Sequence, residues 1–267
     1  MVRLRKFEDD MVDEIVFEVD KEQIPTCNIM GVNIAAVNME WLIDFTKRHI
    51  KNLAGNYICV SNVHTTVMSF DNADYCAVQN GGILAIPDGG PLSCVGRKRG
   101  FSKMKRTTGP DYLMEILKIS SQEGYRHYFY GSTDETLTKL KKHLEKNFPD
   151  VNVVGMYSPP FRKLSEEENA EIVRQINECH PDFVWVGLGA PKQELWMAEQ
   201  KGKVSGLMEG VGAAFDYMAG NILRAPRWMQ ESNLEWAYRL MQEPKRLFKR
   251  YLYSNVKFLW NVVIKRK

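Results

Sequence analysis

Short apolar segments alternate with longer amphipathic segments along most of the sequence, and this alternation restricts the fold more than any other feature. The short segments, which suit strands, are 57–61, 83–86, 125–130, 151–154, 183–188 and 204–208. The amphipathic segments, which suit helices, are 64–80, 110–124, 133–147, 166–179 and 191–201. Such alternation predicts βαβ units, and therefore an α/β fold in which helices cover both faces of a mostly parallel sheet.

Local signals mark where several of these helices begin. Ser165 followed by Glu168 is a capping box, in which each side chain bonds the backbone N–H of the other residue. Ser132 or Thr133 can cap the helix after the third strand, and Pro191 suits a first helical turn. The predicted helix starts therefore do not depend on hydrophobic periodicity alone.

Bulk composition narrows the class of protein. The chain has 267 residues, of which 44% are hydrophobic and 26% charged, as expected of a globular protein. No run of about 18 apolar residues is present, so no transmembrane helix is predicted. The first ten residues lack the apolar core of a signal peptide, which predicts a cytoplasmic protein. Five scattered cysteines, none in Cys-x-x-Cys spacing, predict neither a disulfide framework nor a zinc site.

The C-terminal segment differs in charge from the rest of the chain. Residues 224–267 hold eleven Lys or Arg and three Glu, although the whole chain has a net charge of only +3. The same segment contains eight aromatic residues, and Phe248, Leu252, Leu259 and Val263 lie near one face of a predicted helix. Cations beside an apolar face are typical of a helix that lies on an anionic membrane surface. The alternative is a helix packed on the domain, and different faces of one helix can do both.

These patterns divide the chain into an α/β domain over 1–226 and a basic, aromatic helical appendage over 227–267. We expect no nucleic-acid partner, because the positive charge is confined to one end and no recognised motif accompanies it. The sequence leaves open whether the chain forms a homo-oligomer.

Ligands of open parallel sheets bind beyond the carboxyl ends of the strands, which directs attention to the residues that follow each predicted strand. Asp88 follows the second strand; it is either a turn residue or a general base that takes a proton from an acceptor hydroxyl. Arg106 ends a run of six cations within ten residues and directly precedes a helix-start signature. The run is either a solvated face or, at Arg106, a clamp for phosphate or carboxylate.

Three glycine-containing turns follow other strands and are candidates for nucleotide binding. The backbone at Gly131 could cradle a pyrophosphate, although this turn also suits ordinary strand–helix chemistry. Gly187 and Gly189 permit close approach of a ligand, and the next helix begins with Lys192, Gln193 and Glu194. Beyond Gly212, Asp216 either caps a helix or accepts ribose hydroxyls.

Histidines offer little evidence of metal binding. His64 follows the first strand and is a secondary candidate for substrate binding. The remaining histidines show no metal-ligand spacing, and no Asp-x-Asp motif is present, so no metal site is predicted.

Taken in order, the motifs resemble those of the WecG/TagA/CpsF glycosyltransferases, a family of lipid-linked N-acetylmannosaminyltransferases and their relatives. The similarity covers about residues 56–250. It rests on Asn62, Pro87-Asp88-Gly89, Arg106-Thr-Thr-Gly-Pro-Asp111, Gly131, Pro181 to Glu194, Gly210 to Asp216, Arg224-Ala-Pro226, Leu234-Glu-Trp236 to Arg239, and Glu243-Pro-Lys-Arg246.

The resemblance implies a Rossmann-like core whose C-terminal appendage closes over the site and contacts the inner face of the cell membrane. It implies an inverting, metal-independent and cofactor-free transfer of N-acetylmannosamine from UDP-ManNAc to undecaprenyl-pyrophosphate-linked GlcNAc, in wall or surface polysaccharide synthesis.

By position in the motifs, the resemblance also assigns residue roles. It makes Asp88 the base with Arg106 near it, and it places Asn62 and Gln193 in the sugar pocket. Asp216 binds the nucleotide, and Arg239 and Arg246 meet the diphosphate.

The sequence departs from the family pattern near the expected donor pocket. Val60 stands where the family often has Thr, and Pro159-Pro160-Phe161 stands where it often has Gly-Tyr-Phe. A different donor, such as UDP-glucose or UDP-ManNAcA, is therefore an alternative with the same chemistry. A nucleotide-binding oxidoreductase would require a dinucleotide fingerprint, which the sequence lacks. A non-enzymatic membrane adaptor would leave Asp88 and the turn at 189–194 without a purpose.

Overall fold

The computed structural model describes residues 19–265, so the N-terminal segment and the last two tail cations lie outside the described residues. Its centre is a six-stranded sheet in the order β4-β3-β8-β7-β5-β6, with every neighbouring pair parallel. The strands are β3 (Tyr57–Ser61), β4 (Leu84–Pro87), β5 (Arg126–Gly131), β6 (Asn152–Tyr157), β7 (Phe183–Gly187) and β8 (Leu207–Gly210). All six predicted strands are therefore confirmed, with ends that shift by up to three residues.

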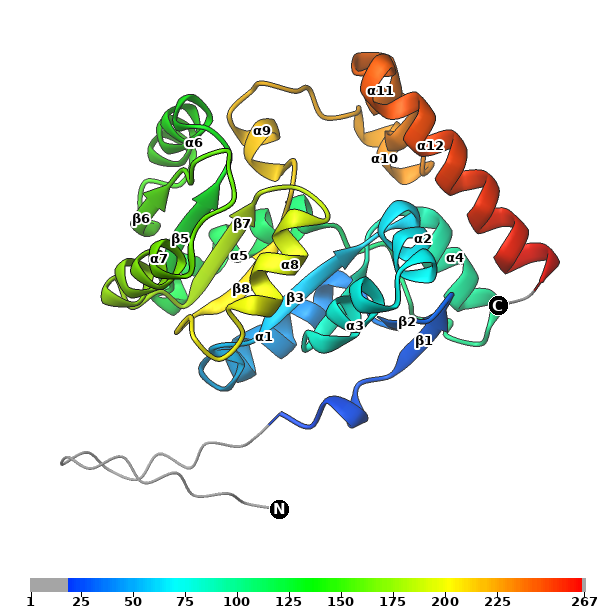
Figure 1. Ribbon diagram of the computed structural model, residues 1–267, viewed down its shortest axis with the longest axis horizontal. Helices are drawn as coiled ribbons and strands as arrows, with labels where there is room; N and C mark the ends of the chain where they lie inside the picture. The colour runs from blue at the N-terminus through cyan, green and yellow to red at the C-terminus, as the bar shows by residue number, and fades with distance from the viewer. Residues whose placement is uncertain (1–18, 266–267) are drawn as a thin grey trace.

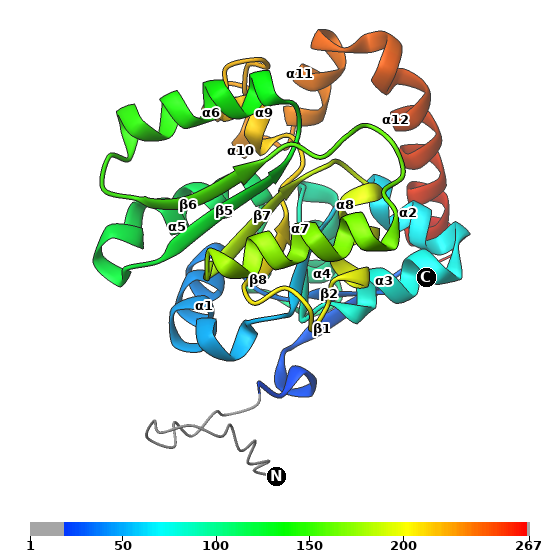
Figure 2. The ribbon, with the colours of Figure 1, turned by 60° about the vertical axis from the view of Figure 1, so that its left-hand side comes forward.

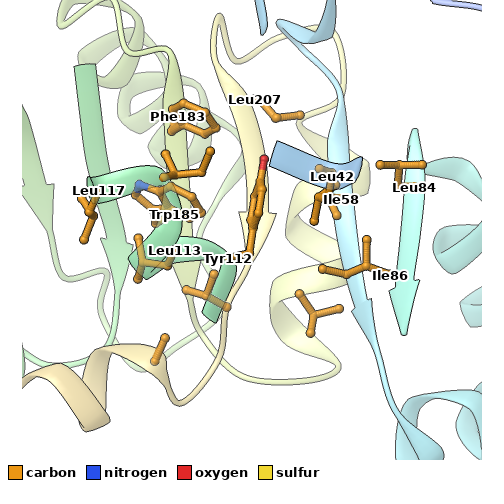
Figure 3. Close-up of a cluster of buried hydrophobic side chains, with 14 of the residues drawn as sticks. Leu42, Ile58, Leu84, Ile86, Tyr112, Leu113, Leu117, Phe183, Trp185 and Leu207 are labelled. Carbon is orange, nitrogen blue, oxygen red and sulfur yellow. The ribbon is translucent and has the colours of Figure 1, made fainter. Parts of the chain in front are cut away.

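Helices cover both faces of this sheet, which confirms the predicted α/β class (Figures 1 and 2). One face packs against α1 (Met39–Leu53), α5 (Gly109–Glu123), α6 (Asp134–Asn147) and α9 (Ala214–Met218). The other packs against α2 (Val63–Asp71), α4 (Gly90–Lys98), α7 (Glu166–Glu178) and α8 (Lys192–Glu199). Figure 3 shows part of the first core layer, where Tyr112 and Leu113 of α5 lie among the strand residues Ile58 and Trp185.

The helix caps follow the sequence signals. Ser165 and Glu168 form the predicted capping box, and Thr133 caps α6 by accepting a hydrogen bond from the N–H of Thr136. The predicted helix over 64–80 is instead two helices, α2 and α3 (Ala73–Gly81), separated by Asn72. Asn72 adopts an extended backbone and caps α3 with its side chain, which breaks the helix at that residue.

The segment before β3 forms a β-hairpin that the sequence analysis did not predict. Its strands, β1 (Thr26–Ile29) and β2 (Val32–Ala35), are antiparallel, and a 3₁₀ turn (Lys21–Gln23) precedes them. The two turn residues, Met30 and Gly31, have φ values of 52° and 95°, which is typical of a tight hairpin turn. The hairpin adds Cys27, Ile29, Val32 and Ile34 to the core layer under α2 and α4.

Three further helices follow the sheet: α10 (Arg227–Glu231), α11 (Glu235–Gln242) and α12 (Pro244–Leu259), the last continued by a π-helical turn (Trp260–Ile264). Helix α12 lies beside α2 (Figure 1) and buries Leu247 and Phe258. It is joined to α2 by the Tyr253 hydroxyl, which donates to Asp71 over 2.8 Å, and by the ion pair between Lys257 and Asp71.

The opposite face of α12 is apolar and exposed. Phe248, Leu252, Val256, Leu259 and Trp260 each keep more than half of their surface open. One face of α12 therefore packs on the domain, as one interpretation of the tail predicts, whereas membrane contact by its exposed apolar face stays a prediction. Between residues 19 and 265, no helix has the length and apolarity needed to cross a membrane.

The strand order places a switch point in the middle of the sheet. From β3 the chain moves outward to β4, whereas from β5 it moves outward to β6 on the other side, and β8 and β7 fill the centre. Ligands of such sheets bind in the crevice beyond the carboxyl ends of the strands at this point. A ligand site is therefore expected among the turns that follow β3, β4, β7 and β8.

Candidate active site

Asp88 lies in the turn between β4 and α4, at the carboxyl edge of the sheet. Its N–H donates to the carbonyl of Ser61, at the end of the neighbouring strand β3, over 2.7 Å. Gly89 follows with φ = 102°, a left-handed conformation that a β-carbon disfavours, and so turns the chain into α4. The side chain of Asp88 is half-buried, and its position confirms only the location that the sequence predicts.

The environment of Asp88 suits a general base. Burial raises the pKa of its carboxyl to about 7, against the opposing effect of Arg106. Glu235 and Asp111 raise it further, and Arg224 lowers it. A group with a pKa near neutrality is ionised often enough to accept a proton and basic enough to hold it. No group among residues 19–265 donates a hydrogen bond to the Asp88 carboxylate.

The four charges that act on Asp88 form a cluster of their own. Arg106 forms an ion pair with Glu235, and its Nη1 lies 3.9 Å from Asp111. Arg224 lies 2.7 Å from Asp111 and 3.4 Å from Glu235. Each guanidinium thus faces both carboxylates. We call Arg106, Asp111, Arg224 and Glu235 the charge cluster; it joins the start of α5 to the C-terminal helices.

The loop between α10 and α11 rests directly on the turn that carries Asp88. A β-carbon on Gly90 would lie 2.0 Å from Oδ1 of Asn233, so only a glycine at this position permits the contact. Asn233 itself has φ = 59°, in the left-handed region where asparagine is favoured over most residues. The C-terminal segment therefore contacts the Asp88 turn by packing, and it contacts the residues 106–111 by ion pairs.

Arg239 of α11 also reaches this site. It is 9% exposed, and its guanidinium donates to the Tyr217 hydroxyl over 2.9 Å and to Glu243 over 2.8 Å. Its Nε is buried without a hydrogen-bond partner among the described residues. Burial raises the pKa of Tyr217 and Arg239 opposes this effect, while Glu235 and Asp88 make smaller contributions in the same direction as burial. Arg246 is more exposed and shares Glu243, which places it at the rim.

The glycines of β5 and β7 bring two turns together. Gly131 and Gly187 are paired in the sheet, and a β-carbon on Gly131 would lie 2.7 Å from the carbonyl carbon of Gly187. Gly189 has φ = 76°, and its N–H donates to Oε1 of Gln193 over 3.0 Å. Lys192 is exposed in the first turn of α8. This edge offers a backbone surface next to a helix N-terminus, as anion sites require.

Gln193 and Glu194 lie beneath this turn. Gln193 is 4% exposed and its Nε2 donates to Glu194 and to the Gly210 carbonyl, over 2.8 and 3.0 Å. Glu194 is fully buried, and burial raises the pKa of its carboxyl. Their expected contacts with substrate stay predictions, because the structure shows their polar groups turned to the protein.

The last predicted nucleotide residues follow β8. Gly212 has φ = 53°, and a β-carbon there would lie 3.7 Å from Oε1 of Gln193, so the turn after β8 touches the turn after β7. Asp216 is half-buried in α9, and Asn221 donates to its Oδ1 over 3.1 Å. Asp216 is not the N-cap of α9, which is Ala213, so the capping alternative is wrong.

Asn62 and His64 are engaged by neighbouring elements. The Asn62 side chain caps α2 by accepting the N–H groups of His64 and Thr65. Nδ1 of His64 lies 3.0 Å from the Ser254 hydroxyl of α12. Burial, with a smaller effect from Arg250, lowers the pKa of His64 to about 4, so the ring is neutral at physiological pH. His64 thus connects the first strand turn to the tail helix.

The sequence analysis gave no role to Asp111, Tyr217, Arg224 or Glu235, although the structure gathers all four around Asp88 and Arg239. Asp111, Arg224 and Glu235 each lie in one of the motifs that resemble the family. This membership was the one feature of the sequence that could have identified them as site residues. The motifs did not reveal that Arg224 forms ion pairs with both Asp111 and Glu235. Among residues 19–265, no group of three or more His, Cys, Asp or Glu side chains is arranged to hold a metal ion.

Several known proteins are similar to this chain over most of its length. Relatives from Bacillus subtilis (strain 168), Bacillus spizizenii and Staphylococcus aureus (strain MW2) bear the name N-acetylglucosaminyldiphosphoundecaprenol N-acetyl-beta-D-mannosaminyltransferase. They are 28%, 28% and 23% identical to this chain over 78%, 72% and 82% of its length, and the matches cover 80%, 73% and 86% of theirs. The sequence model of the Glycosyl transferase WecG/TagA/CpsF family matches residues 27–267. The chain therefore belongs to the WecG/TagA/CpsF family of glycosyltransferases.

Proposed function

We propose that this protein transfers N-acetylmannosamine from UDP-ManNAc to undecaprenyl-pyrophosphate-linked GlcNAc, in the synthesis of a cell-wall or surface polysaccharide. The observation that carries the proposal is Asp88, a carboxyl group with a pKa of about 7 on which the guanidinium groups of Arg106 and Arg224 act. The names of the relatives supply the donor sugar and the acceptor.

Asp88 acts as the base in this proposal. It takes the proton from the acceptor hydroxyl while that oxygen forms a bond to the anomeric carbon of the donor sugar. The bond between that carbon and the UDP oxygen breaks on the opposite side, so the configuration inverts and UDP leaves. General-base assistance of this kind contributes about 10²–10⁴-fold in rate.

The negative charge that develops on UDP requires a positive counterpart. Arg106 and Arg224 lie close enough to Asp88 to act on its carboxyl, and Arg239 of α11 and Arg246 of α12 add positive charge from the C-terminal helices. Because these arginines can meet the diphosphate, the proposed reaction is metal-independent. Gly131, Gly187, Gly189, Lys192, Gly212 and Asp216 form the proposed nucleotide surface at the same sheet edge.

The C-terminal helices have two parts in the proposal. Residues 227–267 form an appendage on the catalytic domain 1–226, and α11 closes the site through Glu235 and Arg239. The exposed apolar face of α12, with Lys245, Lys249 and Arg250 on the same helix, binds the anionic inner face of the cell membrane. The protein would then be peripheral on the cytoplasmic side, where it meets its lipid-linked acceptor.

A donor screen tests the proposal. Purified protein and a short-chain lipid-pyrophosphate-GlcNAc acceptor are incubated in EDTA with UDP-ManNAc, UDP-GlcNAc, UDP-glucose or UDP-ManNAcA, and UDP release is measured. Turnover with UDP-ManNAc alone supports the proposal. Turnover with another donor keeps the mechanism but changes the pathway; this alternative is favoured by Pro159-Pro160-Phe161, which departs from the Gly-Tyr-Phe that the family often has there. Activity that requires added metal would contradict the arginine role.

A further inference from the structure

Tyr217 of α9 lies against two arginines that come from different segments of the chain. The guanidinium carbon of Arg239, in α11, lies 5.3 Å from the centre of the Tyr217 ring. The guanidinium carbon of Arg224, in the loop between α9 and α10, lies 6.0 Å from the same centre. A guanidinium within about 6 Å of the centre of an aromatic ring is attracted to the negative face of that ring. One half-buried tyrosine therefore contacts both arginines.

The hydroxyl of Tyr217 forms a hydrogen bond with one of these arginines. Nη1 of Arg239 donates to this hydroxyl over 2.9 Å, and Nη2 donates to Glu243 over 2.8 Å. Because a guanidinium is planar and rigid, acceptors on its two terminal nitrogens fix the plane of the group. Nε of Arg239 already lacks an acceptor among residues 19–265, so loss of the Tyr217 oxygen would leave a second donor of this buried cation unpaired. Tyr217 thus supplies the bond by which the α/β domain orients Arg239.

Tyr217 is also the contact that two separate groups of charged side chains share. Arg224 belongs to the charge cluster, whereas Arg239 shares the carboxylate of Glu243 with Arg246. Within residues 19–265, no ion pair joins one group to the other. Every arginine that we propose to meet the diphosphate belongs to one of these two groups. The placement of the two groups relative to each other therefore depends in part on the tyrosine between them.

Packing alone would explain the ring of Tyr217 but not its hydroxyl. A phenylalanine would fill nearly the same space and would also offer an aromatic face to a cation. The hydroxyl instead accepts a hydrogen bond from a buried cation at the candidate active site. Tyr217 directly follows Asp216, which we propose to bind the nucleotide, so one short helix carries both residues. The position of Tyr217 therefore suits a residue that aligns the arginines with the nucleotide.

We propose that Tyr217 is a positioning residue for the transfer: its hydroxyl and its ring hold Arg239 and Arg224 where these arginines meet the diphosphate of the donor. This inference rests on the proposed function. The negative charge on the diphosphate grows as UDP leaves, so correctly placed arginines stabilise the transition state more than they stabilise the bound donor. A displacement of about 1 Å in such a site can cost about a hundredfold in rate. Tyr217 acts through the two arginines and takes no part in the making or breaking of bonds.

The substitution Tyr217→Phe tests the proposal, because it removes the oxygen that accepts from Arg239 and leaves the ring in place. We expect kcat to fall about tenfold to a hundredfold, with a smaller change in KM for the donor, since the lost interaction strengthens in the transition state. Tyr217→Leu also removes the ring and should lower kcat further. If Tyr217→Leu lost no more activity than Tyr217→Phe, the ring contacts would play no part and the proposal would be overturned.

The matched control is Tyr253→Phe, which removes another tyrosine hydroxyl that joins the C-terminal helices to the α/β domain. The Tyr253 hydroxyl donates over 2.8 Å to Asp71 of α2, and not to an arginine of the site. With a short-chain acceptor, we expect Tyr253→Phe to keep kcat within twofold of the wild type. Equal losses in Tyr217→Phe and Tyr253→Phe would show that only the attachment of the helices matters, and would overturn the proposal. A kcat of Tyr217→Phe within twofold of the wild type would also overturn it.

The affinity for UDP, measured by titration calorimetry without donor or acceptor, tests the inference separately from turnover. UDP carries the charge that develops during transfer, so Tyr217→Phe should bind UDP about threefold to tenfold more weakly than the wild type does. UMP lacks the second phosphate, and its affinity should change less. Unchanged UDP affinity in Tyr217→Phe would overturn this inference and leave the proposed function standing. If the wild type neither binds UDP nor turns over any of the four donors, the proposed function fails and the inference fails with it.

Discussion

Glu235 of α11 forms an ion pair with Arg106, across 129 residues of sequence, directly beside the Asp88 carboxyl. The contact has two consequences. It fastens the C-terminal helices to the sheet edge, and it places a negative charge where it raises the pKa of Asp88. The helix that we propose to close the site therefore also raises the pKa of Asp88.

Glu235→Gln should make Asp88 a weaker base. Glu235 raises the pKa of Asp88, so its neutral replacement should lower that pKa and move the acidic limb of the pH profile of kcat/KM to lower pH. Profiles of the variant and wild type between pH 5 and pH 9 check this. An unchanged midpoint of the acidic limb would show that Glu235 does not act on Asp88. The control is Glu231→Gln, which removes an exposed ion pair with Arg227 on α10 and should leave the midpoint unchanged.

The wild-type profile should itself rise through a pKa near 7. The ionised form of Asp88 accepts the proton, so activity increases as pH passes through the pKa of about 7. The effect on stability has the opposite sign. The pKa of Asp88 in the folded state exceeds the ordinary value of 3.8, so Asp88 favours folding at low pH and this contribution is lost as pH rises through about 7.

Asp88→Asn removes that titration, so its melting temperature relative to wild type should be higher at pH 8.5 than at pH 5.5. Thermal melts at the two pH values measure the difference. A pH-independent difference would mean that Asp88 keeps an ordinary pKa in the folded protein.

A chain that ends at residue 226 should fold but have no transferase activity. The six-stranded sheet and its flanking helices α1 to α9 all precede this point, whereas Glu235 and Arg239 are lost with the appendage. Circular dichroism melts establish folding, and UDP release with a short-chain acceptor measures turnover. Full activity of the truncated chain would contradict the closing role of α11.

Replacing the apolar face of α12 should weaken membrane binding. The variant Phe248→Ser, Leu252→Ser and Leu259→Ser removes three side chains that are 56–58% exposed. Co-sedimentation with vesicles containing anionic lipid should fall, because buried apolar area and charge attraction together determine this binding. Phe161→Ser, on an exposed loop outside the tail, should bind vesicles as the wild type does. If the triple variant, Phe161→Ser and the wild type all bound vesicles equally, α12 would be excluded as the membrane contact.

Much of the sheet could be predicted from the sequence, because buried parallel strands are short apolar runs bounded by turn residues. The β1–β2 hairpin was missed: its strands have four residues each, with polar residues between the buried ones. Helix α4 was missed because it begins at Gly90, within a Pro-Asp-Gly-Gly sequence that also reads as a turn.

The location of the candidate site could be predicted from the positions of the strands. The contacts between its side chains could not be predicted from the sequence. Asp88 and the glycine turns follow strands, so the rule for parallel sheets places them at one edge. The pairing of Arg106 with Glu235 and the burial of Gln193 depend on how distant segments pack.

The most direct test of the account is the comparison of Asp88→Asn with the wild type at pH 7, using the best donor and a short-chain acceptor. The account predicts that turnover falls by about 10²–10⁴-fold, because the base is lost. It also predicts that UDP binds the variant as tightly as it binds the wild type, since the nucleotide surface is unchanged. Turnover within a few fold of wild type, with UDP binding intact, would contradict the assignment of Asp88 as the base.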